Sequence, residues 1–117
     1  MKLKLPTAVV VAVTFTAPFL VAQEMDSETA QRMCSSKGEP NPARSWCQGF
    51  FTGATKMGQV WGSLSDRPPF CISWKISPAQ AEKVWSEYLL QDPVHLSQLP
   101  EQSFFYAMKE AFPCDHP

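Results

Sequence analysis

Six residues of this 117-residue chain have side chains that could act as nucleophiles, bases or soft-metal ligands near neutral pH. They are Cys34, Cys47, Cys71, Cys114, His95 and His116. Cys71 or Cys114 beside His116 would pair a thiol nucleophile with a base. Cys114 and His116, completed by His95 or Cys71, are residue types that hold Zn²⁺. Both kinds of chemistry require free thiols, so the redox state of the cysteines decides whether either can occur.

The N-terminus indicates the compartment in which those cysteines reside. Lys2 and Lys4 precede an apolar run over residues 5–21, and the small residue Ala22 follows it. This layout is typical of a secretory signal peptide, here residues 1–22, that is cleaved after its last residue. An uncleaved membrane anchor is the alternative, but prolines and threonines interrupt the run and no basic stop-transfer cluster follows. The sequence therefore predicts export to an oxidising compartment, with no stable membrane anchor after cleavage.

An even number of cysteines in a small exported domain favours disulfide bonds. The sequence by itself leaves all three pairings open. Cys34 and Cys47 flank a short turn, whereas Cys71 and Cys114 each follow a helical segment, so we favour Cys34 with Cys47 and Cys71 with Cys114. Two disulfides leave no thiolate for catalysis or metal binding. We therefore expect no catalytic residue, no metal site and no cofactor.

The charge of the exported region argues against nucleic acid as a partner. Without residues 1–22 the chain keeps eight basic and eleven acidic residues, a net charge of −3 with histidine neutral. Glu82 and Glu87 fall on different sides of a predicted helix, so they form no paired-carboxylate site and are expected to be solvated. Residues 23–117 are enough for one small domain, for which covalent cross-links would supplement a limited core.

The periodicity of this region predicts helices and almost no strand. Asn41 is a preferred cap and Pro42 a preferred first helical residue, and Ser77 with Gln80 has the spacing of a capping box. Prolines and turn residues separate the periodic segments. We predict an all-α domain of four to five helices, stapled by two disulfides, with its main helices over residues 26–34, 41–64, 77–91 and 100–112.

Apolar residues at three- and four-residue steps indicate which helix faces form the core. In the second helix the expected core face is Trp46, Phe50, Ala54, Met57, Trp61 and Leu64. In the third helix it is Ala81, Val84, Trp85, Tyr88 and Leu89, and in the fourth Phe104, Ala107, Met108, Ala111 and Phe112. Between the second and third helices, residues 70–76 (FCISWKI) are expected to cross the core in extended form.

Glycines within the second helix require an explanation, because each costs up to about 1 kcal/mol relative to alanine. Gly49 and Gly53 lie four residues apart on one side of the helix, where another backbone could approach closely. We favour helix packing against the first or third helix of the same chain. A seam between two chains is the alternative.

Several short motifs occur in a fixed order along the chain. They are residues 47–53 (CQGFFTG), Phe70 with Cys71, Gln80 through Val84 to Tyr88 and Leu89, Asp92 with Pro93, and the ending Phe112, Pro113 and Cys114. With the signal peptide, this ordered set resembles the Rap/Tai type of immunity protein from Cys34 to Cys114. The chain departs from that family after Ile72, where the family usually continues with proline and a helix and this chain has Ser73, Trp74, Lys75 and Ile76.

The resemblance implies an all-helical periplasmic protein, often a homodimer, that performs no chemistry of its own. Its partner would be a cognate secreted hydrolase, a peptidoglycan amidase effector of a type VI secretion system, whose active-site cleft it blocks. A periplasmic chaperone or envelope stress protein is the alternative function, since small helical disulfide-bonded proteins also serve there.

Two loop segments are candidates for contact with that partner. Trp74 lies outside any periodic helical face, and Asp66 and Arg67 lie in a turn that Pro68 and Pro69 stiffen. Exposed tryptophans often anchor interfaces, and a rigid turn loses little conformational freedom on binding. We therefore expect Trp74, Asp66 and Arg67 to contact the partner. A tryptophan packed in the core and an ordinary solvated turn are the alternatives.

Overall fold

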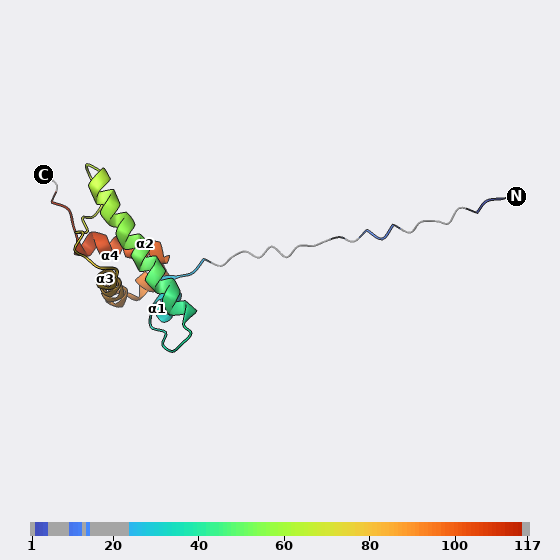
Figure 1. Ribbon diagram of the computed structural model, residues 1–117, viewed down its shortest axis with the longest axis horizontal. Coiled ribbons are helices and arrows are strands. Elements are labelled where there is room, and N and C mark those ends of the chain that lie inside the picture. The colour runs from blue at the N-terminus through green and yellow to red at the C-terminus, as the bar shows by residue number, and fades with distance from the viewer. Residues whose placement is uncertain (1, 5–9, 13, 15–23, 116–117) are drawn as a thin grey trace.

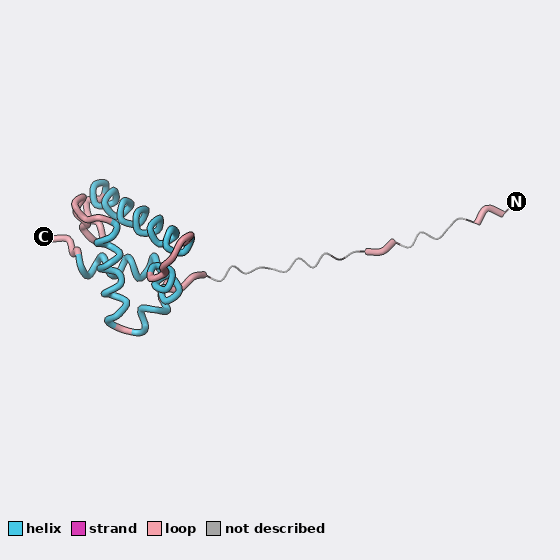
Figure 2. Tube along the Cα trace, turned by 60° about the horizontal axis from the view of Figure 1, so that its bottom comes forward, coloured by secondary structure: helices cyan, strands magenta, loops and turns pink. Residues whose placement is uncertain are grey.

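A computed structural model describes residues 2–4, 10–12, 14 and 24–115 of the chain. Helices make up most of the folded part, and no strand occurs among the described residues. In Figures 1 and 2 the long helix α2 lies along one side of the domain, and loops join the helices at their ends. The helices are α1 (Ser27–Cys34), α2 (Pro42–Leu64), α3 (Pro78–Gln91), the 3₁₀ helix η1 (Pro93–Ser97) and α4 (Pro100–Ala111). The predicted all-α fold is confirmed.

The structure describes only a few residues of the N-terminal segment. The predicted signal peptide, residues 1–22, falls mainly outside the described residues, as does His116. Within the described ranges, no helix is both long enough and apolar enough to cross a membrane. Cleavage of the signal peptide therefore stays a prediction.

Local hydrogen bonds start the first three α-helices at Asp26, Asn41 and Ser77, of which the last two were predicted above. Asp26 Oδ1 accepts from the backbone N–H of Thr29 at 2.8 Å, and this bond lowers the pKa of Asp26 below its usual 3.8. Asn41 Oδ1 accepts from the backbone N–H three residues later at 2.9 Å. Ser77 and Gln80 bond reciprocally, side chain to backbone, at 2.8 and 3.1 Å. These bonds satisfy N–H groups that have no partner within the helix.

Trp85 of α3 is at the centre of the core and has no exposed surface. Its ring packs edge-on against Phe51 of α2, with centroids 5.1 Å apart. Its indole N–H donates to Ser103 Oγ of α4 at 2.7 Å, and Ser27 Oγ of α1 lies 2.7 Å from the same hydroxyl. Four helices therefore meet around one tryptophan. The predicted core faces of α3 and α4 pack into this centre, apart from Ala111, which is exposed.

The core face of α2 differs from the predicted one. Its buried residues are Cys47, Phe51, Thr55, Gly58 and Gln59. Of the predicted stripe, Trp46, Phe50 and Ala54 pack only partly against the core, and Met57, Trp61 and Leu64 are exposed. The two stripes are offset by about one residue, or 100° around the helix axis. The disulfide that joins Cys47 to α1 and the contact of Phe51 with Trp85 turn the observed stripe, rather than the predicted one, toward the core.

Both predicted disulfides are confirmed. Cys34 pairs with Cys47 and joins α1 to α2, with a Cα–Cα distance of 5.3 Å. Cys71 pairs with Cys114 and joins the α2–α3 connection to the C-terminal end, with a Cα–Cα distance of 5.1 Å. The sequence separations are 13 and 43 residues. The second bond therefore restricts the unfolded chain more strongly than the first.

We expect the pair of substitutions Cys71→Ser and Cys114→Ser to lower the free energy of unfolding by about 4 kcal/mol, because the longer loop loses its cross-link. Cys34→Ser with Cys47→Ser should cost about 3 kcal/mol for the shorter loop. Urea denaturation of both variants measures these losses. Unfolding curves that coincide with the wild-type curve would show that the disulfides do not stabilise the fold.

Candidate functional site

The connector between α2 and α3 is anchored at its apolar half. Phe70 and Ile72 are buried. Between them, the backbone N–H of Cys71 donates to the carbonyl oxygen of Phe112 at 2.8 Å, and its sulfur bonds to Cys114. This half of the connector packs on the core as expected. Ser73, Trp74 and Lys75 instead form an exposed turn, so the expectation of an extended crossing over residues 70–76 is wrong for these three residues. Core packing and a covalent bond together fix where the exposed half begins.

A glycine of α2 permits the connector to lie close to the helix. A Cβ atom added at Gly58 would lie 3.0 Å from Phe70 Cε2 and 3.1 Å from Ile72 Cδ1, closer than an ordinary carbon contact. Gly49 and Gly53, the predicted packing pair, are exposed, and an added Cβ at either would have no neighbouring atom within 4 Å in the described part of the chain. The favoured contact with α1 or α3 is not found there. Packing between two chains at this pair stays a prediction.

Gln59 of α2 holds the exposed half of the connector in place. The residue is 1 % exposed, and its Nε2 donates to the carbonyl oxygens of Ser73 at 3.0 Å and Ile76 at 3.1 Å. Its Oε1 is buried without a hydrogen-bond partner among the described residues. Burial of this amide is therefore compensated at its nitrogen alone, and both compensating bonds go to the connector.

Those two carbonyls bracket a tight turn that carries Trp74. The backbone N–H of Lys75 donates to Ser73 Oγ at 3.2 Å, and the N–H of Ile76 donates to the carbonyl oxygen of Ser73 at 3.0 Å. Trp74 is 59 % exposed, and Lys56 Nζ of α2 lies 5.9 Å from its ring centroid, within reach of a cation–π interaction. Trp74 is therefore presented on a fixed turn, and the alternative of a packed tryptophan does not hold.

Asp66 and Arg67 lie at the same end of the molecule. Both are exposed in the turn that follows α2, whose base is Pro68, buried, and Pro69, half-buried. Ser63 and Trp74 line one open hollow of about 250 Å³. Because Ser63 is only three residues before Asp66, the fold places all three predicted contact residues near the C-terminal end of α2.

Exposed apolar residues of α2 enlarge this surface. Met57 is 66 %, Trp61 48 % and Leu64 81 % exposed, with Val60 at 38 %. Sequence reasoning missed them as surface residues because it assigned three of them to the core. The signal that could have found them is Cys47, since a disulfide to α1 requires its stripe to face inward. We define the α2–connector patch as Lys56, Met57, Val60, Trp61, Leu64, Asp66, Arg67, Trp74 and Lys75.

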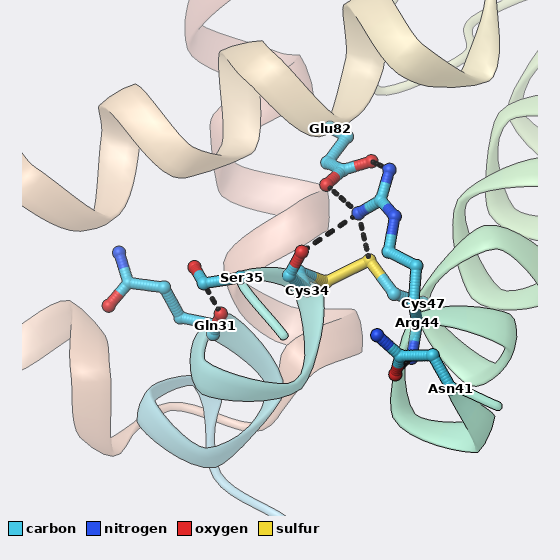
Figure 3. The surroundings of a disulfide bond; sticks show 7 residues. All are labelled: Gln31, Cys34, Ser35, Asn41, Arg44, Cys47 and Glu82. Atoms are coloured by element: carbon cyan, nitrogen blue, oxygen red, sulfur yellow. Dashed lines mark hydrogen bonds and ion pairs between the residues drawn. A yellow bond between two sulfur atoms is a disulfide. The ribbon is translucent and has the colours of Figure 1, made fainter. Parts of the chain in front are cut away.

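A second polar cluster surrounds the Cys34–Cys47 disulfide (Figure 3). Arg44 Nη1 donates to Glu82 Oε1 at 2.6 Å and to the carbonyl oxygen of Cys34 at 2.9 Å, and Nη2 donates to Glu82 Oε2 at 3.2 Å. The hydrogen bond with Glu82 raises the pKa of Arg44 above its usual range. The expectation that Glu82 is only solvated is therefore wrong: packing of α2 on α3 brings a cation beside it.

This cluster has the ligand types of a metal site, but their atoms are engaged. Both sulfur atoms and a carboxylate oxygen of Glu82 lie within 4.8 Å of one another. The sulfurs are bonded to each other, and the carboxylate is paired with Arg44. Cys71 and Cys114 are likewise bonded to each other, so neither supplies the thiol that a Cys–His pair or a site with His116 requires.

His95 stabilises the junction of α3 and η1. Its ring stacks on Tyr88, with centroids 3.9 Å apart and planes 5° from parallel. Its Nδ1 lies 2.8 Å from the carbonyl oxygen of Tyr88. Since a carbonyl oxygen only accepts, Nδ1 carries the hydrogen and donates it. The arrangement fits a structural role for His95.

We expect Gln59→Met to lower the free energy of unfolding by about 1–3 kcal/mol, because it removes both hydrogen bonds to the connector. Trypsin should also cleave after Lys75 faster, since the turn becomes mobile. Urea denaturation and limited proteolysis measure the two effects. Gln48→Met, at an exposed position of the same helix, is the matched control. Equal proteolysis of the two variants would contradict the role assigned to Gln59.

Comparison with known proteins gives the family. The profile of the Rap1a immunity proteins matches residues 25–114, a span that contains every described helix and all four cysteines. Searches of curated proteins and of solved structures found no match. The suspected resemblance is thereby confirmed, and the chain belongs to the Rap1a family of immunity proteins.

Proposed function

We propose that this chain is a periplasmic immunity protein that binds and blocks a peptidoglycan amidase effector of a type VI secretion system. Its membership of an immunity family supports a protein effector as the partner. The N-terminal signal layout supports the periplasm as the place of action. Peptidoglycan lies in that compartment, so an inhibitor located there would meet the amidase before or at its substrate.

The presentation of Trp74 carries this proposal. The side chain is exposed on a turn that Gln59 holds by two hydrogen bonds and that the Cys71–Cys114 bond anchors nearby. Tryptophan is among the residues that contribute most to interfaces, and a contact fixed before binding loses little conformational freedom. Such a turn suits insertion into the cleft of another protein.

The proposed mode of action is occlusion of the amidase. All four cysteines are engaged in disulfides. This supports inhibition by binding to the amidase rather than by a reaction with it. Folding already orders the contact surface, so little conformational entropy is lost on binding, and the surface can fill the active-site cleft as a rigid body. Inhibition should then be stoichiometric.

The mature, disulfide-bonded chain should capture one peptidoglycan amidase from secreted proteins of the source strain and its close relatives. It should inhibit that amidase at a ratio near one to one, because each active-site cleft accepts one inhibitor chain. A pull-down with mass spectrometry followed by titration of peptidoglycan hydrolysis measures both. Trp74→Ala should weaken inhibition by roughly tenfold or more, the effect of removing an interface anchor.

Tyr106→Ala is the matched control for this titration, because Tyr106 is an aromatic of α4 that is 48 % exposed. Both variants should unfold near the wild-type temperature. A large loss of thermal stability in Trp74→Ala would mean that the ring is needed for folding. Protection of an unrelated aggregation-prone protein, without amidase inhibition, would favour the chaperone alternative.

The homodimer that the family resemblance implies is proposed to form through the N-terminal half of α2. Gly49 and Gly53 leave that face bare, and the stacked rings of Trp46 and Phe50, with centroids 5.3 Å apart, lie beside them. Small residues flanked by large ones allow two helices to approach closely. A second copy of α2 would cover the glycines that no part of the described chain covers.

Gly53→Ala should have opposite effects on the monomer and on the dimer. Alanine gains up to about 1 kcal/mol of helix propensity, so the monomer should become more stable. An added methyl group in the seam should weaken the dimer. Thermal unfolding and sedimentation equilibrium measure the two effects. Gly62→Ala, on the opposite side of α2, should change only stability, and equal dimerisation of both variants would contradict the seam.

A further inference from the structure

The basic and acidic residues of the described domain are distributed unevenly along the chain. Between Glu39 and Glu82 the single acidic residue is Asp66, whereas Arg44, Lys56, Arg67 and Lys75 are basic. That segment comprises α2 and the connector. The remaining described part of the domain, residues 24–39 and 82–115, carries ten acidic and four basic residues. In an overall acidic domain, the segment of α2 and the connector therefore carries an excess of basic residues.

The three basic residues of this segment that make no ion pair with a described residue belong to the α2–connector patch. Arg44 is neutralised by Glu82. Lys56, Arg67 and Lys75 are exposed and make no ion pair with any described residue. Lys56 lies over the ring of Trp74, and Lys75 directly follows it. Two of these three positive charges therefore lie beside Trp74, the residue proposed to bind the partner.

The centre of the patch is apolar. Met57, Trp61 and Leu64 are exposed, and Val60 lies among them on the outer side of α2. An apolar centre with a charged rim is the usual anatomy of a protein interface. Because the rim here is mainly positive, the complementary surface must present negative charge around apolar side chains.

We infer that the α2–connector patch binds an acidic face of the effector, in which carboxylates surround apolar side chains. This inference rests on the proposed function and specifies the chemistry of its partner. A second copy of the chain fits poorly, because a symmetric contact would place the same three basic residues of two chains together. An anionic bilayer would be repelled by the acidic remainder of the domain.

Charge reversal tests the rim. Lys56→Glu, Arg67→Glu and Lys75→Glu are combined in one variant, and Lys37→Glu, Lys83→Glu and Lys109→Glu in a control with the same change of net charge. Association with the purified amidase that the wild-type chain inhibits is measured at 20 and 300 mM NaCl. At low salt, the association rate of the patch variant should be lower than the wild-type rate by a factor of roughly ten or more. The association rate of the control variant should stay within about twofold of the wild-type rate after correction for net charge.

Truncation tests the centre. Met57→Ala with Leu64→Ala should speed dissociation of the complex by roughly tenfold, because these side chains lose their apolar contacts with the partner. Leu90→Ala with Val94→Ala, also exposed and outside the patch, is the matched control and should dissociate at the wild-type rate. Thermal unfolding of all four variants verifies that each is folded.

The outcomes separate this inference from the proposed function. If the wild-type chain inhibits the amidase and the patch and control variants bind alike, the docking surface is wrong and the function stands. If the charge-reversed patch variant associates faster than the wild-type chain, the contact face of the effector is basic, and the inference is overturned. If the patch binds vesicles of anionic phospholipid and the chain inhibits no amidase, both the inference and the proposed function are wrong.

Discussion

The burial of one tryptophan organises this domain. Trp85 is completely enclosed, and an enclosed indole N–H destabilises the fold unless an acceptor meets it. Ser103 supplies that acceptor, and Ser27 joins the same hydroxyl. A hydrogen bond has strict limits of distance and direction, so α1, α3 and α4 can pack around this ring only in a narrow range of positions. Phe51 then fixes α2 against its edge.

Two disulfide bonds fix the positions of α2 and of the connector relative to this core. The Cys34–Cys47 bond sets which side of α2 faces inward, and the Cys71–Cys114 bond holds the connector against the chain end. Gly58 and Gln59 then position the connector at close range, one by lacking a side chain and the other by two hydrogen bonds. The exposed turn inherits its rigidity from these contacts.

The proposed binding surface and part of the core lie on two sides of one helix. The inner side of α2 contributes to the core, and its outer side exposes apolar residues that no described part of the domain covers. Exposed apolar side chains grouped with a positive rim would be a liability in a protein without a partner. Under the proposed function, the apolar side chains would hold the effector and the positive rim would speed its association.

The sequence by itself determined the features that depend on neighbouring residues. The helices, the capping box at Ser77 and Gln80 and the all-α class follow from short-range hydrogen bonds and periodicity. The tertiary structure decided the inward side of α2, the pairing of Glu82 with Arg44 and the need for glycine at position 58. A helix with two adjacent apolar stripes can bury either one. Only contacts with residues distant in the sequence select between them.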